Sequence, residues 1–290
     1  MSPNTENLKH DYAQIGGVRL HYVTAGEGEK LVILLHGFPE FWYSWRNQIP
    51  VLSETYTVVV PDLRGYNLSD KPANVGDYEI GKITDDVLGL IRHFGREQAA
   101  VVGHDFGAAV AWRLTQKHPE SVSKLCAMQV PPVSVWRKNQ TLRQFLASWY
   151  MFFFQLPFLP ELFLSANDYA ALGKSLRKTS ARPDVFTDEV IEEYRKSWRE
   201  TEKMTSPLNY YRANILKRFF GKQSTDEKIQ VPTLFIYGEK DHAILPETVR
   251  GVSEAIEAPF SEFRLPEAAH WVQQEAADDV NEVLLDFLAD

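Results

Sequence analysis

Three segments of the chain carry residue types that could act together on a substrate. GHDFG, residues 103–107, places the carboxylate of Asp105 at the centre of a G-x-D-x-G turn. GEKDH follows with Asp241, and PEAAHW follows with His270. The order nucleophile, acid, histidine is that of a catalytic triad, with an aspartate where many such triads have a serine. We therefore expect Asp105 to act as nucleophile, His270 as base, and Asp241 as the group that orients His270.

A carboxylate nucleophile suits attack at a saturated carbon, where it displaces a leaving oxygen or halide and becomes an alkyl ester. An acyl substrate would instead give an anhydride, so hydrolysis of esters and amides is disfavoured. Water activated by His270 could then cleave the alkyl ester, with Asp241 stabilising the positive imidazole. Attack at the ester carbonyl places negative charge on oxygen, which needs hydrogen-bond donors close by.

Backbone groups next to the turn could supply those donors. HGFPE, residues 36–40, follows a short apolar run, and Phe106 follows the expected nucleophile directly. The N–H groups of Phe38 and Phe106 are therefore expected to form an oxyanion hole.

The elements that must position these groups follow from apolar, β-rich runs. Strands are predicted at Arg19–Val23, Leu31–Leu35, Thr57–Val60, Ala99–Gly103, Lys124–Val130, Thr233–Tyr237 and Glu262–Leu265. Helical patterns lie at Lys82–Phe94, Ala108–Lys117, Glu247–Ile256 and Asp278–Leu288. This alternation predicts an α/β fold with a mostly parallel sheet covered on both faces, whose ligands bind at the carboxyl ends of the strands. Each member of the expected triad comes just after a predicted strand.

The alternation stops between Pro131 and Gly221, where helices are predicted at Leu142–Gln155, Asn167–Arg177 and Asp188–Glu202, the last with Thr187 as N-cap. Phe, Trp and Tyr make up 16 of the 80 residues 141–220, or 20%, against 12% of the whole chain. We therefore expect residues 1–130 and 222–290 to form the core and residues 131–221 an inserted helical cap, or lid.

The apolar run Phe145–Leu164 has the length of a membrane span, but Gln155, Pro157, Pro160 and Glu161 interrupt it. A membrane span is therefore not expected. A buried helix or the wall of an apolar pocket is the favoured interpretation.

Composition narrows the class of protein further. The 290 residues are 44% hydrophobic and 24% charged, as in an ordinary globular protein. A net charge of −8 argues against nucleic acid and anionic lipid as partners. With a single cysteine, Cys126, the chain cannot form an internal disulfide or a thiolate metal cluster, and we expect this thiol to be buried and inert. The first ten residues, MSPNTENLKH, lack the apolar stretch of a secretory signal. We expect a cytoplasmic protein without metal or cofactor; the sequence leaves its oligomeric state open.

Taken together, HGFPE, PDLRGYNLSDKP (Pro61–Pro72), GHDFG, GEKD and the late His270 resemble the α/β-hydrolase superfamily, and most closely its epoxide hydrolases. The resemblance covers nearly the whole chain. It implies an enzyme that opens small apolar epoxides with water to vicinal diols, using two tyrosines of the cap. SPLNYYR matches the second tyrosine motif of that family and assigns the role to Tyr211, and WYMFFFQ resembles the first and assigns it to Tyr150.

Epoxide opening produces an alkoxide, a poor leaving group, so a proton donor must stand beside the ring oxygen. Tyrosine, with an unperturbed pKa of about 10, remains protonated at neutral pH and can donate. Glu40 and His104 resemble residues that lie near the hydrolytic water in some related enzymes. Glu40 could equally cap the following helix, and His104 could satisfy backbone groups behind the turn.

Two other functions remain open at this stage. A haloalkane or haloacid dehalogenase would use the same triad but must bind the departing halide. Haloalkane dehalogenases usually have Trp directly after the nucleophile, where this chain has Phe106, and many have Asn after the HG pair, where it has Phe38. Fluoroacetate-type dehalogenases have Arg after the nucleophile. Neither phenylalanine has a side-chain hydrogen-bond donor. Many epoxide hydrolases also carry Trp at position 106, and Trp136 or Trp149 could supply an indole N–H. The second alternative is a ligand-binding receptor that keeps the fold without activity.

Overall fold

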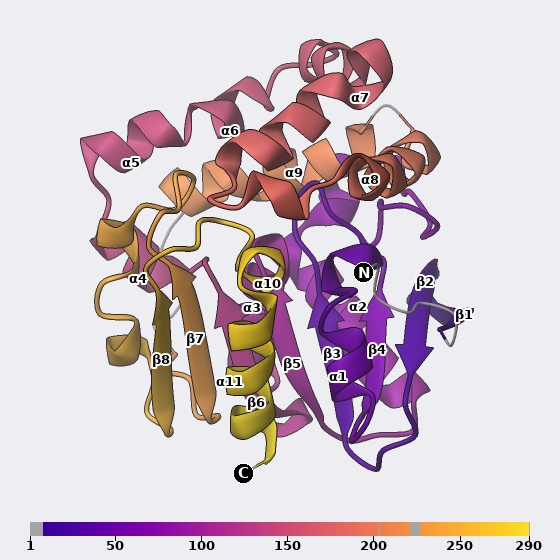
Figure 1. Ribbon diagram of the computed structural model, residues 1–290, viewed down its shortest axis with the longest axis vertical. Helices are drawn as coiled ribbons and strands as arrows, with labels where there is room; N and C mark the ends of the chain where they lie inside the picture. The colour runs from indigo at the N-terminus through magenta and orange to yellow at the C-terminus, as the bar shows by residue number, and fades with distance from the viewer. Residues whose placement is uncertain (1–7, 203, 221–226, 290) are drawn as a thin grey trace.

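A single twisted sheet organises the molecule. The computed structural model describes residues 8–202, 204–220 and 227–289 (Figure 1). The strands are β1 Lys9–Ile15, β2 Val18–Ala25, β3 Leu31–Leu35, β4 Thr57–Pro61, β5 Ala99–His104, β6 Val122–Met128, β7 Thr233–Gly238 and β8 Phe260–Leu265. Their spatial order is β1-β2-β4-β3-β5-β6-β7-β8; β2 pairs antiparallel with β1 and β4, and all other pairs are parallel. The predicted α/β fold with a mostly parallel sheet is confirmed.

All seven predicted strands are present, with ends that differ by up to two residues, but β1 was not predicted. It is an edge strand that joins β2 through a turn at Gly16 and Gly17. Of its side chains only Ala13 is buried, so β1 has no alternating apolar pattern to reveal it.

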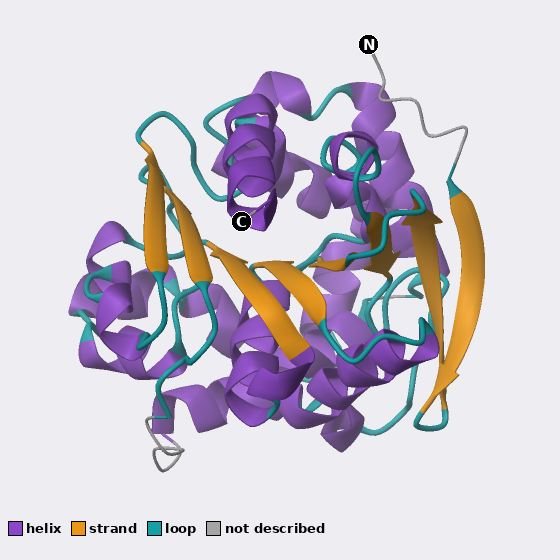
Figure 2. Ribbon diagram, turned by 90° about the horizontal axis from the view of Figure 1, so that it is seen from below, coloured by secondary structure: helices purple, strands orange, loops and turns teal. Residues whose placement is uncertain are grey.

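Helices cover both faces of the sheet, as Figure 2 shows. The core helices are α1 Ile49–Leu52, α2 Ile80–His93, α3 Phe106–Lys117, α10 Val272–Glu275 and α11 Ala277–Ala289. In β3, Ile33 and Leu35 pack in the cluster that contains side chains of α2 and α3, whereas Val32 and Leu34 pack in the cluster that contains side chains of α1 and α11. All five residues of β3 are buried because both faces are covered.

The remaining helices form a layer over the loops that follow the strands (Figure 1). They are α4 Val133–Lys138, α5 Leu142–Ala147, α6 Trp149–Phe153, α7 Leu159–Thr179, α8 Asp188–Glu200 and α9 Thr205–Phe220. Phe41, which lies beyond β3, and Trp271, which lies beyond β8, belong to the same apolar cluster as Leu172 of α7 and Tyr211 of α9. No strand occurs among the described residues of 131–221. The predicted boundary between 221 and 222 lies outside the described residues, as does most of the N-terminal segment MSPNTENLKH.

Several helix predictions need correction. The predicted helix Glu247–Ile256 is wrong: two 3-10 turns, Pro246–Val249 and Val252–Ala255, flank Gly251, whose φ of +73° breaks the helix. The other 3-10 turns are Trp42–Trp45, Val75–Tyr78, Pro119–Ser121 and Pro183–Val185. The predicted Leu142–Gln155 helix divides at Ser148 into α5 and α6, and α9 was not predicted. The N-cap is confirmed, because Thr187 accepts a hydrogen bond from the Val190 N–H at 3.3 Å.

The apolar run Phe145–Leu164 is buried only in part. Among the described residues no helix is long and apolar enough to cross a membrane. Met151, Phe154 and Leu164 are buried as expected, but Trp149 is 64% exposed and Phe158 is 82% exposed. The expectation of a buried helix or pocket wall therefore holds for these three side chains and is wrong for Trp149 and Phe158, which are exposed.

The turn after β5 brings backbone segments too close together for side chains. A Cβ on Gly107 would lie 2.1 Å from the carbonyl oxygen of Leu35, and one on Gly103 would lie 2.3 Å from that of Gly107. Real Cβ atoms do not approach backbone oxygen so closely, so glycine is required at both positions. These contacts hold the start of α3 against the end of β3.

Gly107→Ala is expected to lower the free energy of unfolding by about 1–3 kcal/mol, because β3 or α3 must shift to admit the methyl group. Urea titration followed by circular dichroism measures the change. Gly81→Ala in α2 is the matched control, since nothing lies within 4 Å of its added Cβ. That control should stabilise the protein by about 0.5–1 kcal/mol through its helix propensity. An equal effect of both substitutions would contradict the packing argument.

Candidate active site

The predicted site residues from four separate segments lie together at the carboxyl edge of the sheet. Asp105 lies between β5 and α3, Phe38 lies beyond β3, Asp241 beyond β7, and His270 beyond β8. Parallel strands end at a common edge, which is why segments so distant in sequence can meet there.

Asp105 has a backbone conformation that is uncommon for a residue with a side chain. Its φ of +52° and ψ of −117° turn the chain sharply between β5 and α3. Its Oδ1 accepts a hydrogen bond of 3.0 Å from the Phe38 N–H. A Cβ on Gly37 would lie 2.4 Å from the Cβ of Asp105, so glycine next to Phe38 allows this close approach. Phe106 is the first residue of α3. The backbone N–H of Phe106 therefore has no acceptor within the helix.

His270 lies between the two aspartates. Its Nδ1 is 2.7 Å from Oδ2 of Asp241, and its Nε2 is 3.6 Å from Oδ2 of Asp105. Oδ1 of Asp241 accepts hydrogen bonds from the N–H groups of Ala243 at 2.7 Å and Ile244 at 3.0 Å. Backbone N–H groups therefore hold the oxygen of Asp241 that does not contact His270. The structure brings the three residues predicted as a triad together, with His270 between the two aspartates.

The charges of this group shift two pKa values in opposite directions. Burial favours the neutral form of Asp105 and would raise its pKa. Hydrogen bonding to His270 and the charge of His270 outweigh burial and lower the pKa of Asp105 to about 2, and His104 and the Phe38 N–H make smaller contributions. Burial likewise opposes a charged His270, yet Asp241 and Asp105 raise its pKa well above the usual 6.5. The charges of the site thus favour an ionised Asp105 and the protonated form of His270.

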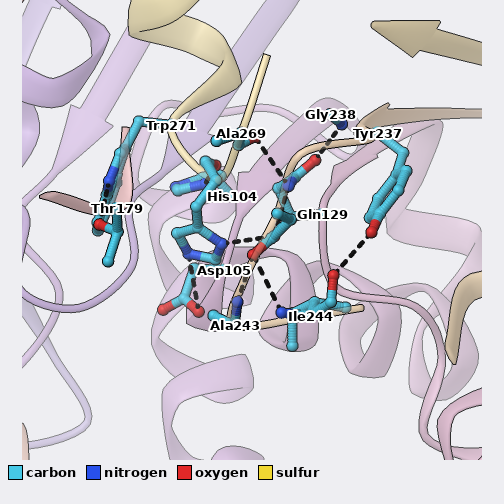
Figure 3. Close-up of polar contacts among 12 residues, drawn as sticks. His104, Asp105, Gln129, Thr179, Tyr237, Gly238, Ala243, Ile244, Ala269 and Trp271 are labelled. Atoms are coloured by element: carbon cyan, nitrogen blue, oxygen red, sulfur yellow. Dashed lines mark hydrogen bonds and ion pairs between the residues drawn. The ribbon is translucent and has the colours of Figure 1, made fainter. Parts of the chain in front are cut away.

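Gln129 was not identified from the sequence, yet its side chain joins three segments of the site (Figure 3). Its Nε2 donates to Oδ2 of Asp241 at 2.5 Å and to the carbonyl of Ala269 at 3.1 Å, and its Oε1 accepts from the Gly238 N–H at 2.6 Å. The side chain is fully buried, and its backbone φ is +66°. The predicted strand Lys124–Val130 therefore ends early, at Met128. A glutamine inside an apolar strand run was the available signal.

Glu40 and His104 belong to a buried polar network behind His270. His104 contacts Oε2 of Glu40 through Nδ1 at 2.9 Å and the carbonyl of His270 through Nε2 at 2.8 Å. Oε1 of Glu40 also accepts from Gln274 at 2.8 Å and from Tyr194 of α8 at 3.3 Å. The alternative role of Glu40 as a helix cap is not observed, since the following turn has no side-chain cap. The alternative role of His104, a hydrogen bond to a backbone group behind the turn, is observed in its contact with the carbonyl of His270.

Two tyrosines of the helical layer lie above this edge. The rings of Tyr150 on α6 and Tyr211 on α9 are 6.1 Å apart between centroids. The Tyr211 ring packs edge-on against Phe106 at 4.9 Å and against Phe38 at 5.3 Å. The structure therefore brings Tyr211 directly over the two residues that flank the carboxylate of Asp105.

Two aromatic candidates and the cysteine lie elsewhere. Trp149 is 64% exposed on the outer side of α6, so it is not available as an indole donor to Asp105. Trp136 is fully buried and packs against Phe219 at 4.8 Å. Cys126 is buried within β6, and burial raises the pKa of its thiol, as expected of an inert cysteine. Across residues 8–202, 204–220 and 227–289 no group of three or more potential metal ligands occurs.

This arrangement can carry out covalent catalysis. An ionised carboxylate stands at the head of a strained turn, with a backbone donor on one of its oxygens and a histidine beside the other. The rings of Phe38 and Phe106 lie next to it and pack against Tyr211, whose ring is 6.1 Å from that of Tyr150.

Comparison with known proteins supports the same interpretation. Residues 30–277 match the family described as alpha/beta hydrolase fold. The chain is 39% identical to an AB hydrolase superfamily protein of Bacillus subtilis, over 98% of this chain and 99% of that one. It is 38% identical to epoxide hydrolase 1 of Caenorhabditis elegans, over 99% of this chain and 72% of that one. The crystal structure of an epoxide hydrolase of Bacillus megaterium with an inhibitor superposes with a TM-score of 0.88 at 31% identity, covering 97% and 100% of the two chains.

Gln129→Glu is expected to make folding stability depend on pH. The new carboxylate would face Oδ2 of Asp241, which lies 2.5 Å from the amide nitrogen it replaces. Two like charges at this distance raise the folded-state pKa of the pair above its unfolded value, so the free energy of unfolding falls as pH rises through the folded pKa. The loss amounts to about 1.4 kcal/mol for each unit of that shift.

Urea titrations at pH 5 and pH 8 measure this loss, with the exposed Gln98→Glu as control. The control should show little difference from the parent protein at either pH. If Gln129→Glu is equally stable at both values, relative to the parent, the amide of Gln129 is not holding Asp241.

Proposed function

The chain belongs to the α/β-hydrolase fold family and, within it, to the epoxide hydrolases, and we propose that it converts small apolar epoxides to vicinal diols through an ester on Asp105. The observation that carries the proposal is the ionised carboxylate of Asp105 at the head of the turn, with Tyr211 above it. Residues 131–221 are the proposed cap, and residues 1–130 and 222–290 the proposed core.

The first step is attack by Oδ2 of Asp105 on an epoxide carbon. Oδ1 is engaged by the Phe38 N–H, which leaves Oδ2 as the reacting oxygen. A C–O bond forms to Asp105 while the ring C–O bond breaks and its electron pair goes to the ring oxygen. Tyr211 and Tyr150 hold that oxygen and supply the proton that makes it an alcohol. Phe38, Phe106 and Phe154 pack against the ring of Tyr211, and apolar side chains at this position favour apolar substrates.

The second step is attack by water on the carbonyl carbon of the Asp105 ester. His270 takes the proton of that water, and the negative charge that develops on Oδ1 is stabilised by the N–H groups of Phe38 and Phe106. The bond between Cγ and Oδ2 of Asp105 then breaks, and Oδ2 leaves in the diol with the proton that His270 took up. The second proton of the water returns to the tyrosine that protonated the ring oxygen, so the carboxylate of Asp105 is restored. Oxygen from water thus ends on Asp105, while the carboxylate oxygen that attacked leaves in the product.

Formation of the ester prepares His270 for this second role. In the free enzyme burial lowers the pKa of His270, but the charges of Asp241 and Asp105 both raise it and so favour the protonated imidazole. Esterification makes Asp105 neutral and removes one of these charges, so the pKa of His270 falls and the base becomes available. Asp241 remains to orient the ring and to stabilise it once it is protonated again.

Glu40 and His104 are proposed to position the attacking water. They form a fully buried network that adjoins the backbone of His270 and reaches Tyr194 of the cap. The chemistry of both steps is provided by side chains, backbone N–H groups and water. A cytoplasmic location is proposed as well, supported by the single buried cysteine.

Epoxide opening is favoured over halide release by what surrounds Asp105. Phe38 and Phe106 have no side-chain donor, and Trp149 points away from the site. The two tyrosines, by contrast, suit a leaving oxygen that must be protonated.

His270→Gln is expected to form the ester but not to hydrolyse it. The intact mass of the variant after incubation with styrene oxide should increase by one substrate molecule, while diol production falls by at least about a hundredfold. Asp105→Ala is the control, since it lacks the nucleophile and should show neither adduct nor diol. A His270→Gln protein that loses turnover without accumulating an adduct would falsify the two-step assignment.

Tyr211→Phe is expected to reduce turnover of styrene oxide by about 10²–10⁴-fold, because it removes one donor to the leaving oxygen. Tyr210→Phe is a matched control on the next residue of α9, whose hydroxyl donates to the Arg64 carbonyl at 2.7 Å. That control should lose about 1 kcal/mol of stability and keep its turnover rate. Steady-state rates and urea midpoints of both variants separate the two roles; equal rates would remove Tyr211 from the mechanism.

A further inference from the structure

The outer side of the cap carries most of the exposed apolar surface of the protein. Fourteen large hydrophobic side chains of the described residues are exposed, and nine of them fall within residues 142–163, which comprise α5, α6, the following loop and the start of α7. These nine are between 42% and 82% exposed. We call them the outer apolar face; it includes Leu146, Trp149, Phe158 and Leu162. Concentration on this scale indicates an interaction surface rather than the scattered exposure that is normal.

The outer apolar face has almost no polar groups. Within residues 142–163 Arg143 is the only exposed polar residue, although the chain as a whole has a net charge of −8. Glu161, the other charged residue of this stretch, is buried and pairs with Arg212 at 2.7 Å. Protein interfaces form about one hydrogen bond per 100–200 Å², and this face offers few groups that could form them. Lipid acyl chains require none.

Phe158, the last residue of the loop before α7, combines two unfavourable features. It is 82% exposed, and its φ of +64° lies in the left-handed region that bulky side chains rarely adopt. Asparagine would be better tolerated there on both counts. The outward position of a phenylalanine at this point is therefore explained more readily by a contact than by folding.

A chain of aromatic contacts joins the outer face to the reaction site. The ring of Trp149 lies 6.2 Å from that of Phe153, which lies 6.0 Å from Phe154, which in turn lies 4.9 Å from Tyr211. Packed aromatic rings thus continue from the outside of the cap to Tyr211, which packs against Phe38 and Phe106.

We propose that the outer apolar face docks on the surface of a zwitterionic lipid bilayer, with the side chains of α5, α6 and the 154–158 loop inserted among the headgroups and upper acyl chains. Short amphipathic helices with Trp, Phe and Leu on one side bind in this way without spanning the membrane. The benefit to catalysis rests on the proposed function, because apolar epoxides partition into lipid and would reach the enzyme from there. Docking itself does not depend on turnover.

Flotation of the full-length protein with phosphatidylcholine vesicles tests the proposal. The double variant Phe158→Asn and Leu162→Gln should reduce the bound fraction relative to the parent by about tenfold or more, since two apolar anchors are lost. A matched double variant, Leu68→Gln and Val75→Asn, replaces exposed apolar residues outside the face and should bind like the parent. Binding should persist at high salt, because the contact is apolar rather than ionic.

Three outcomes would overturn the proposal: no binding of the parent protein, equal loss in both double variants, or release by salt. If the parent protein forms dimers in light scattering that the Phe158→Asn and Leu162→Gln variant does not, and vesicles are not bound, a second copy covers the face instead. Turnover of styrene oxide without vesicles should be the same in parent and variants. A protein that binds vesicles but opens no epoxide would contradict the proposed function and leave the docking inference intact.

Discussion

The site depends on one backbone constraint, the turn that forces Asp105 to a φ of +52°. This conformation is unfavourable for aspartate and persists only because the packing around it leaves no alternative. Glycines at 37, 103 and 107 provide the space, since a Cβ at any of them would lie within 2.4 Å of a neighbouring atom. The same close packing places the Phe38 N–H on Oδ1 of Asp105. The same backbone contacts therefore stabilise the turn and position the carboxylate of Asp105, the nucleophile in our proposal.

The site also depends on the balance of charge among Asp105, His270 and Asp241. His270 lies between Asp105 and Asp241, and the charges of both favour its protonated form. In the proposed mechanism the loss of charge on Asp105 is what releases the base, so each chemical step prepares the next. Gln129 and the N–H groups of Ala243 and Ile244 hold Asp241 without adding charge. A neutral amide suits this position because a further carboxylate would disturb the same balance.

The helical layer has two sides with different environments. Its inner side places Tyr211 against Phe38 and Phe106, with Tyr150 beside it. Tyr194 on the same side joins the buried network of Glu40. Its outer side exposes apolar residues of α5, α6 and α7. The apolar character that the sequence shows throughout Phe145–Leu164 therefore serves two surfaces: one lines the reaction site, and the other, in our proposal, meets lipid.

The sequence by itself determined the elements whose signals are local. Buried parallel strands are continuous apolar runs, and a tight turn needs small residues, so seven strands and the GHDFG turn could be predicted. Edge strand β1 could not, because one buried side chain leaves no periodic pattern, and the Glu247–Ile256 helix failed because Gly251 adopts a positive φ. Only the tertiary structure brought Gln129 to Asp241 across 112 positions and separated the inner from the outer side of the cap. Such contacts depend on which distant segments become neighbours when the sheet forms. The residue pattern within one segment does not indicate which other segment will lie beside it.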